Sequence, residues 1–158
     1  MSNKIDILIL MGSDSDWEVM SEAANVLDNF KTTYEARVSS AHRTPERTLT
    51  IVREAEERGC KVIIAGAGAA AHLAGVVAGH TLLPVIGIPL NATSLQGIDA
   101  LLATVQMPAG IPVASMAIGK AGATNAALFA LQILAGADSE IAGQLARYRK
   151  DMTQKVEA

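Results

Sequence analysis

The chain has 158 residues and a formal net charge of −3, and it contains no run of basic residues. Hydrophobic residues make up 50% of it and aromatic residues only 3%, so we expect an aliphatic core and few rings for stacking bases. This balance argues against a nucleic-acid-binding protein and against a protein that docks on an acidic membrane surface. Cys60 is the only cysteine, which rules out an internal disulfide.

Apolar runs of strand length alternate with segments of helical spacing along the chain. Residues 5–11 are apolar except for Asp6, a pattern typical of a strand buried on both faces. The other expected strands are 33–38, 61–65, 84–88 and 112–118, with 33–38 at an edge because it is more polar. The expected helices are 14–30, 44–58, 71–79, 95–105, 123–134 and 138–154. The alternation predicts an α/β fold, a flavodoxin-like three-layer α/β/α sandwich with a five-stranded parallel sheet in the order 2-1-3-4-5.

No linker, repeat or low-complexity segment interrupts this pattern. We therefore expect a single domain over residues 1–158, with its core at about 4–135 and a C-terminal oligomerisation helix at about 138–154. The segment TNAALFALQILAG is apolar on nearly all sides, which is more than one small domain can bury. The last helix carries an apolar stripe and lies beyond the fifth βα unit. These two helices predict a homo-oligomer; the alternative is that the last helix covers its own sheet.

The strand order also predicts where a ligand binds. Ligands of an open parallel sheet bind beyond the carboxyl ends of the strands, near the point where the strand order reverses. Three loops flank that point, and each combines small residues with polar groups: GSDSD at 12–16, SSAHRTP at 39–45 and GAGAAAH at 66–72. Their composition predicts a site for a small ligand at this edge of the sheet.

The middle loop places His42 beside Arg43, just before the helix start marked by Thr44 and Pro45. An arginine fork with free backbone N–H groups makes a good phosphate clamp. The same positive surroundings favour a neutral imidazole, which can act as a general base and, once protonated, as a general acid. The pair therefore predicts phosphate binding combined with proton transfer.

In the first loop, Gly12 lets the backbone approach a ligand, and Ser13 offers a hydroxyl at a helix N-terminus. Asp14 and Asp16 sit in the first helical turn, where they are helix caps, ligand contacts or, as an alternative, magnesium ligands. A histidine such as His72, taken alone, is more often a structural hydrogen-bonding residue.

Three familiar motifs do not fit. GAGAAA matches the relaxed dinucleotide pattern, but it follows the third strand and lacks an acidic residue about 20 positions later. GKAG at 119–122 fails as a P-loop because Ala114 replaces the first glycine and Ala121 replaces the Ser or Thr. A phospho-receiver domain needs an aspartate at the end of the third strand, where Ala65 and Gly66 stand.

GSDSDW, SSAHRTP, AGAGAAAHLAG and VQMPAGIPVASMAIGKAGATNAAL, in this order, resemble the motifs of one enzyme family. It is the class I N5-carboxyaminoimidazole ribonucleotide mutase family of bacterial purine synthesis, the PurE family. The resemblance runs from Ile7 to about Leu134. It implies a flavodoxin-like homo-octamer whose C-terminal helices reach neighbouring subunits, with no metal and no other cofactor. The N-terminal segment lacks a signal-peptide pattern and no apolar run reaches membrane-spanning length, so we expect a cytoplasmic protein.

The resemblance also implies a reaction and its residues. The family moves a carboxylate from the exocyclic nitrogen of the ribonucleotide to ring carbon four, with carbon dioxide held in the site as an intermediate. His42 matches the catalytic histidine, which gives a proton during decarboxylation and then removes the carbon-four proton. Arg43 would hold the phosphate and Asp16 the ribose hydroxyls. The implied substrate-binding residues are Gly12, Ser13, Asp16, Ser40, Arg43, Ala67, Gly68, Ala69 and His72.

The chain departs from the family pattern GAGGAAHLPG, because Ala69 replaces a glycine and Ala74 a proline, and Ala109 stands where relatives often carry arginine. A methyl group at 69 is expected either to narrow the pocket or to require a φ below zero. Two other functions stay open. One is a direct aminoimidazole ribonucleotide carboxylase using carbon dioxide, which the AAHL context of His72 disfavours. The other is a non-catalytic nucleotide- or flavin-binding module, which His42 and the scarcity of aromatic residues disfavour.

Overall fold

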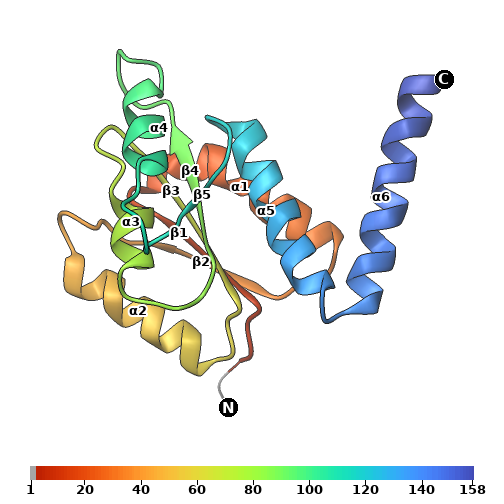
Figure 1. Cartoon of the computed structure of the whole chain (residues 1–158), viewed down its shortest axis with the longest axis horizontal. Helices are drawn as coiled ribbons and strands as arrows, with labels where there is room; N and C mark the ends of the chain where they lie inside the picture. Colours follow the sequence, from red (N-terminus) through yellow and green to blue (C-terminus); the bar gives the residue numbers. More distant parts are fainter. Residues whose placement is uncertain (1–2) are drawn as a thin grey trace.

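A computed structural model describes residues 3–158 and contains a five-stranded parallel sheet in the order β2-β1-β3-β4-β5 (Figure 1). The strands are β1 (Ile7–Met11), β2 (Tyr34–Val38), β3 (Val62–Gly68), β4 (Val85–Leu90) and β5 (Ala114–Ser115). The helices are η1 (Asp14–Asp16), α1 (Trp17–Asn29), α2 (Pro45–Glu57), α3 (Leu73–Ala78), α4 (Ile98–Val105), α5 (Lys120–Ala135) and α6 (Ser139–Glu157). The predicted fold class, strand order and edge position of β2 are confirmed.

Helices cover both faces of the sheet, and β1 divides its side chains between two cores. Ile7, Ile9 and Met11 pack with α1 and α5 on one face. Leu8 and Leu10 pack with α2 and α3 on the other face. All five side chains are almost fully buried, as expected for a central parallel strand whose two faces are both covered. Figure 1 shows α1 beside α5, with α2, α3 and α4 on the opposite side of the sheet.

The third strand is longer than predicted and takes up part of the expected glycine-rich loop. Gly66, Ala67 and Gly68 pair with β4 residues Ile88, Pro89 and Leu90. The two glycines are needed for packing: a Cβ on Gly66 would lie 2.3 Å from the sulfur of Met20, and one on Gly68 would lie 2.5 Å from Cβ of Ala92. The loop proper therefore begins at residue 69.

The fifth strand is shorter than predicted, with two residues in place of 112–118. Beyond it, Met116 N still donates to Gly87 O at 2.9 Å, and Gly119 N donates to Pro89 O at 3.0 Å. The segment thus follows β4 without a regular ladder. The helix α4 also starts later than expected, because Gln96 and Gly97 adopt φ angles of 55° and 87° just before it.

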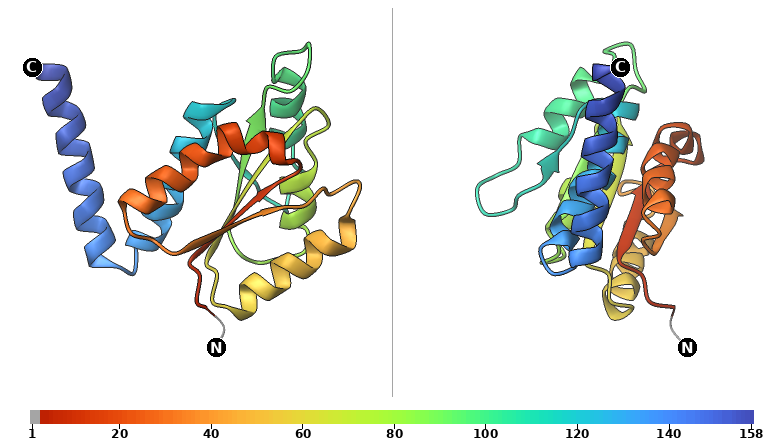
Figure 2. Two further views of the ribbon diagram at one scale, coloured as in Figure 1. Left: turned by 180° about the vertical axis from the view of Figure 1, so that it is seen from behind. Right: turned by 90° about the vertical axis from the view of Figure 1, so that its right-hand side faces the viewer.

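The last helix is capped by Asp138, whose Oδ1 accepts hydrogen bonds from Glu140 N and Ile141 N. Figures 1 and 2 show α6 beside α5, with its C-terminal end standing away from the sheet. Its first half packs on its own chain, where the ring of Tyr148 lies 5.9 Å from that of Phe30. Its second half leaves Met152 exposed. Among residues 3–158, no helix combines the length and the apolar composition that crossing a membrane requires.

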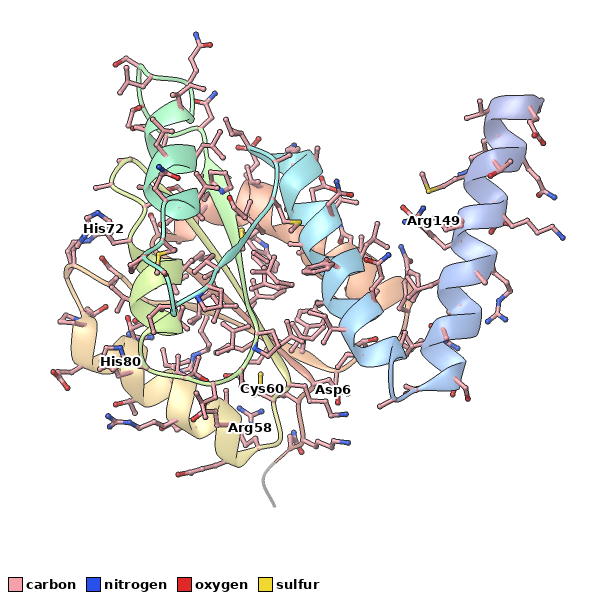
Figure 3. The ribbon with its side chains drawn as sticks, in the orientation of Figure 1. Asp6, Arg58, Cys60, His72, His80 and Arg149 are labelled. Atoms are coloured by element: carbon pink, nitrogen blue, oxygen red, sulfur yellow. The ribbon has the colours of Figure 1, made fainter. Side chains whose placement is uncertain are left out.

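An ionic cluster lies at the end of the sheet opposite the three predicted loops, where Figure 3 labels Asp6, Arg58 and Cys60. Glu35 of β2 accepts hydrogen bonds there from Arg37 Nη1 at 2.7 Å and Arg58 Nη1 at 2.5 Å. These two bonds lower the pKa of Glu35, against the smaller opposing effect of burial. A lowered pKa means that the carboxylate stabilises the fold above its unfolded pKa and loses this effect as the pH falls through the folded pKa.

We therefore expect Glu35→Gln to lower the free energy of unfolding by about 1 kcal/mol at pH 7, a value reduced by partial exposure of the pair. The difference from the wild type should shrink as the pH falls from neutral toward 3. Urea denaturation followed by circular dichroism at several pH values measures it, with the exposed Glu54→Gln as the matched control. A destabilisation that does not change with pH would contradict the ionic explanation.

Candidate active site

A cavity of about 370 Å³ lies beyond the carboxyl ends of β1, β2 and β3. The structure brings all ten predicted site residues to its wall: Gly12, Ser13, Asp16, Ser40, His42, Arg43, Ala67, Gly68, Ala69 and His72. The other residues of the cavity wall are Ser15, Ala41, Ala70, Leu73 and Ala92. The position matches the ligand site expected from the reversal of strand order at β1.

The loop after β1 is a tight turn held by its own side chains. Ser13 N donates to Asp16 Oδ2 at 3.1 Å, and Asp16 N donates to Ser13 O at 3.2 Å. Asp14 Oδ1 accepts from Ser15 N at 2.9 Å. Burial raises the pKa of Asp16, although the backbone N–H groups of Ser13 and Gly12 and the charge of Arg43 oppose this. Asp16 is thus a fixed carboxylate on the cavity wall, suited to accept a hydroxyl hydrogen bond.

The magnesium alternative for the two aspartates has no support in the geometry. Asp14 and Asp16 are both engaged with backbone N–H groups of their own loop. Within the described residues, no group of three or more His, Cys, Asp or Glu side chains is arranged to hold a metal ion. Asp16 forms a capping box with Ser13 at the start of η1 and also faces the cavity, while Asp14 bonds within the loop.

The loop after β2 is anchored by the buried hydroxyl groups of Ser39 and Thr48. Ser39 N donates to Met11 O at 2.8 Å, and its Oγ lies 2.8 Å from Oγ1 of the buried Thr48. Thr44 Oγ1 accepts from Ser40 N at 3.0 Å. These bonds join the loop to β1 and α2. They therefore hold the backbone in place next to His42 and Arg43, the two exposed residues at the tip of the loop.

Arg43 at that tip connects two of the loops. Its backbone N–H donates to Ser40 Oγ at 3.1 Å, its Nε donates to the same oxygen at 3.4 Å, and its Nη2 donates to Gly12 O at 3.2 Å. A guanidinium has five N–H donors. Two of them bond to Ser40 and Gly12, so three have no partner among the described residues and can bind a ligand. An exposed arginine held in this way, next to the start of α2, can bind an anion such as a phosphate.

The two histidines of the site are in direct contact. His42 Nε2 lies 2.7 Å from His72 Nδ1, and the rings meet edge to face with centroids 4.8 Å apart. Figure 3 shows His72 at the start of α3, on the side where the β2–α2 loop lies. A hydrogen bond between two imidazoles needs one N–H donor and one bare nitrogen, so it persists only while the pair carries at most one extra proton. The arrangement can therefore hold or pass on a single proton.

The third loop makes its turn at Ala69, which has a φ of 54°. The expected requirement for a φ below zero at this alanine therefore does not hold. The residues that follow are folded tightly, since Ala71 N donates to Ala69 O and His72 N donates to Ala70 O, both at 2.8 Å. An alanine here adopts the left-handed conformation that glycine adopts without cost.

Two features of the site were not predicted. The contact between His42 and His72 joins residues 30 positions apart, and neither residue type nor spacing indicates it. Ala92 follows β4 and enters the wall because it packs against Gly68. Its place directly after a strand end was a usable signal, since every loop at the carboxyl edge of a parallel sheet is a candidate.

Comparison with known proteins agrees over nearly the whole chain. Residues 6–155 match the model of a family described as AIR carboxylase. A protein of Pyrococcus horikoshii named N5-carboxyaminoimidazole ribonucleotide mutase is 56% identical over 99% of this chain and 87% of its own. A Bacillus subtilis protein of the same name is 53% identical over 94% of this chain and 91% of its own. The crystal structure of Treponema denticola PurE superposes with a TM-score of 0.87 at 32% identity, covering 97% of this chain and 94% of that one.

Proposed function

The chain belongs to the AIR carboxylase family, and on this premise we propose that it is an N5-carboxyaminoimidazole ribonucleotide mutase of purine biosynthesis. The Pyrococcus horikoshii and Bacillus subtilis relatives of this name are 56% and 53% identical over 99% and 94% of the chain. The observation that carries the proposal is a single cavity that holds the anchored Arg43 and the paired His42 and His72. Such a cavity combines an anion clamp with a proton carrier, as this reaction requires.

Each end of the ribonucleotide has a partner in the cavity. Arg43 binds the phosphate with its free N–H groups, helped by the N-terminus of α2. Asp16 accepts hydrogen bonds from the ribose hydroxyls, and Ser13 and Ser40 contribute further polar contacts. Gly12 and Gly68 lie in the wall, where the small residues Ala67 and Ala69 leave room for a flat imidazole. This orientation places the base toward the two histidines.

The chemistry needs one proton that moves twice. When the N-carboxylate loses carbon dioxide, its C–N bond breaks, and the electron pair stays on nitrogen, which takes a proton from protonated His42. Carbon four then attacks the retained carbon dioxide and forms a C–C bond. Neutral His42 removes the carbon-four proton, so the ring regains aromaticity and the histidine regains its proton. Alanine walls around the cavity exclude water and retain the carbon dioxide.

His72 assists the proton transfer because its hydrogen bond engages one of the two ring nitrogens of His42. With Nε2 bonded to His72 Nδ1, Nδ1 of His42 is the nitrogen free to exchange a proton with the substrate. The bond also fixes the orientation of the His42 ring and links the tautomer of each histidine to that of the other. The pair needs neither a metal nor another cofactor for these steps.

The alternative reaction is the direct carboxylation of aminoimidazole ribonucleotide with carbon dioxide, and the matching family is described as AIR carboxylase. Assay of the purified protein with each substrate separates the two. Rapid 4-carboxylation from N5-carboxyaminoimidazole ribonucleotide alone is the expected result. Efficient use of aminoimidazole ribonucleotide with bicarbonate would make the protein a carboxylase, and tight ligand binding without turnover in either assay would leave a binding module.

We further infer that a single domain over 1–158, of which residues 1 and 2 lie outside the described part, assembles as a cytoplasmic homo-octamer. A stretch without surface charge supports assembly: residues 81–119 contain one charged residue, Asp99, and its Oδ2 accepts a hydrogen bond from Thr93. Along this stretch an apolar stripe is about half exposed: Leu95, Ile98, Leu102 and Val105. Soluble monomers rarely expose a contiguous apolar surface of this kind.

Leu102→Lys should therefore shift the protein to smaller species, because a buried charge without a partner costs several kcal/mol at an interface. Sedimentation velocity at micromolar concentration measures the change. Thr50→Lys, on the exposed face of α2, is the control and should sediment like the wild type. If the Leu102 variant also kept the wild-type sedimentation coefficient, the stripe on α4 would not be an interface.

A further inference from the structure

The short connection between β3 and α3 is held at both ends. Gly68 is the last residue of β3, where it pairs with Leu90 and leaves no space for a Cβ. On the other side, Ala71 and Leu73 are each only 2% exposed, and Leu73 belongs to the core under α3. Residues 69–72 must therefore turn the chain within a fixed gap.

Ala69 makes that turn by adopting the left-handed conformation, with a φ of 54°. Two short hydrogen bonds fix the backbone between Ala69 and His72: Ala71 N donates to Ala69 O, and His72 N donates to Ala70 O. His72 is thus two tight turns away from Ala69, and its ring ends 2.7 Å from His42. Because Gly68 is held in β3, a change of φ at residue 69 would redirect the chain that leads to His72.

We propose that Ala69 is a positioning residue, whose left-handed backbone aims the His72 ring at His42. The proposal concerns the backbone angle and not the methyl group itself. It rests on the proposed mutase reaction only for its kinetic readout, since the contact between the two histidines can be observed without substrate. Three substitutions separate angle from size: glycine and asparagine tolerate a positive φ, whereas the β-branched valine does not.

The first experiment observes the hydrogen bond between the two rings by NMR in the 15N-labelled protein without substrate. In the wild type, and in Ala69→Asn and Ala69→Gly, a 15N–15N coupling through the hydrogen bond should connect His42 Nε2 and His72 Nδ1. In Ala69→Val this coupling should be lost. Ala137→Val, in the exposed turn between α5 and α6, is the matched control and should keep the coupling.

The second experiment measures turnover in the same variants. Ala69→Val should lower kcat by about tenfold to a hundredfold with a much smaller change in KM, because a misplaced His72 affects the proton-transfer step and not ribonucleotide binding. Ala69→Asn should be at least about fivefold faster than Ala69→Val despite its larger side chain. The double variant Ala69→Val, His72→Asn should have the kcat of His72→Asn alone, since residue 69 acts through His72.

The outcomes are distinct. If Ala69→Val kept the coupling between the two rings, or if asparagine and glycine removed it as valine does, the backbone angle would not be what positions His72. If the double variant lost the full factor of both single changes, residue 69 would act independently of His72. The coupling between the two rings, seen in a wild-type protein that lacks mutase activity but loses the coupling in Ala69→Val, would support the positioning role while refuting the proposed function.

Discussion

His42→Asn is expected to lower kcat by about a thousandfold, within the range found when a general acid–base group is removed. Asparagine keeps a hydrogen-bonding side chain of similar reach, but it cannot take up and return a proton near neutral pH. Phosphate binding by Arg43 does not depend on the imidazole, so the Kd for the ribonucleotide should change by less than about threefold. Steady-state turnover and calorimetric titration with the product measure the two quantities separately.

The chain offers a matched control in its third histidine. His80 lies beyond the C-terminal end of α3, where its Nδ1 contacts Val76 O, and it does not line the cavity (Figure 3). His80→Asn should keep the turnover of the wild type. Retained turnover in His42→Asn would remove this residue from the chemistry, and an equal loss in His80→Asn would indicate a general effect on folding.

The fold was predictable because its signals are local. A central strand such as β1 is apolar at every position, and Pro45 and Gly59 mark the start and the end of α2. The errors lie where tertiary packing decides. β3 extends through Gly66 and Gly68, where Met20 and Ala92 pack closely against the two glycines. From the sequence alone, glycines at these positions predict a loop. The irregular course of residues 116–119 beside β4 depends on two isolated hydrogen bonds that leave no pattern in the sequence.

The sequence predicts which loops form the site, but it does not predict which side chains in them touch. His42 and Arg43 stand out because a helix start needs neither of them, and strand order brings their loop beside those at 12–16 and 66–72. The distance between His42 and His72 depends on the left-handed turn at Ala69. Alanine is a poor signal for such a turn because its usual φ is negative. Only the structure shows that the two rings can share a proton.

Arg43→Ala should weaken binding of the ribonucleotide by about 30- to 150-fold, equivalent to about 2–3 kcal/mol for charged hydrogen bonds to a phosphate. The guanidinium is already oriented by Ser40 Oγ and Gly12 O, so little side-chain freedom is lost when the phosphate binds. The kcat at saturating substrate should change much less, because the phosphate lies away from the reacting carbon. Calorimetric titration with the ribonucleotide and with the corresponding nucleoside measures the effect.

The comparison of these two ligands gives the sharpest test of the clamp. In the wild type the nucleotide should bind far more tightly than the nucleoside, and in Arg43→Ala this preference should largely disappear. Arg43→Lys should fall between the two, since an ammonium keeps the charge but loses the fork geometry. Arg47→Ala, one turn further along α2 and outside the cavity wall, is the control. If Arg43→Ala weakened nucleotide and nucleoside equally, the arginine would shape the loops after β1 and β2 and would not bind the phosphate.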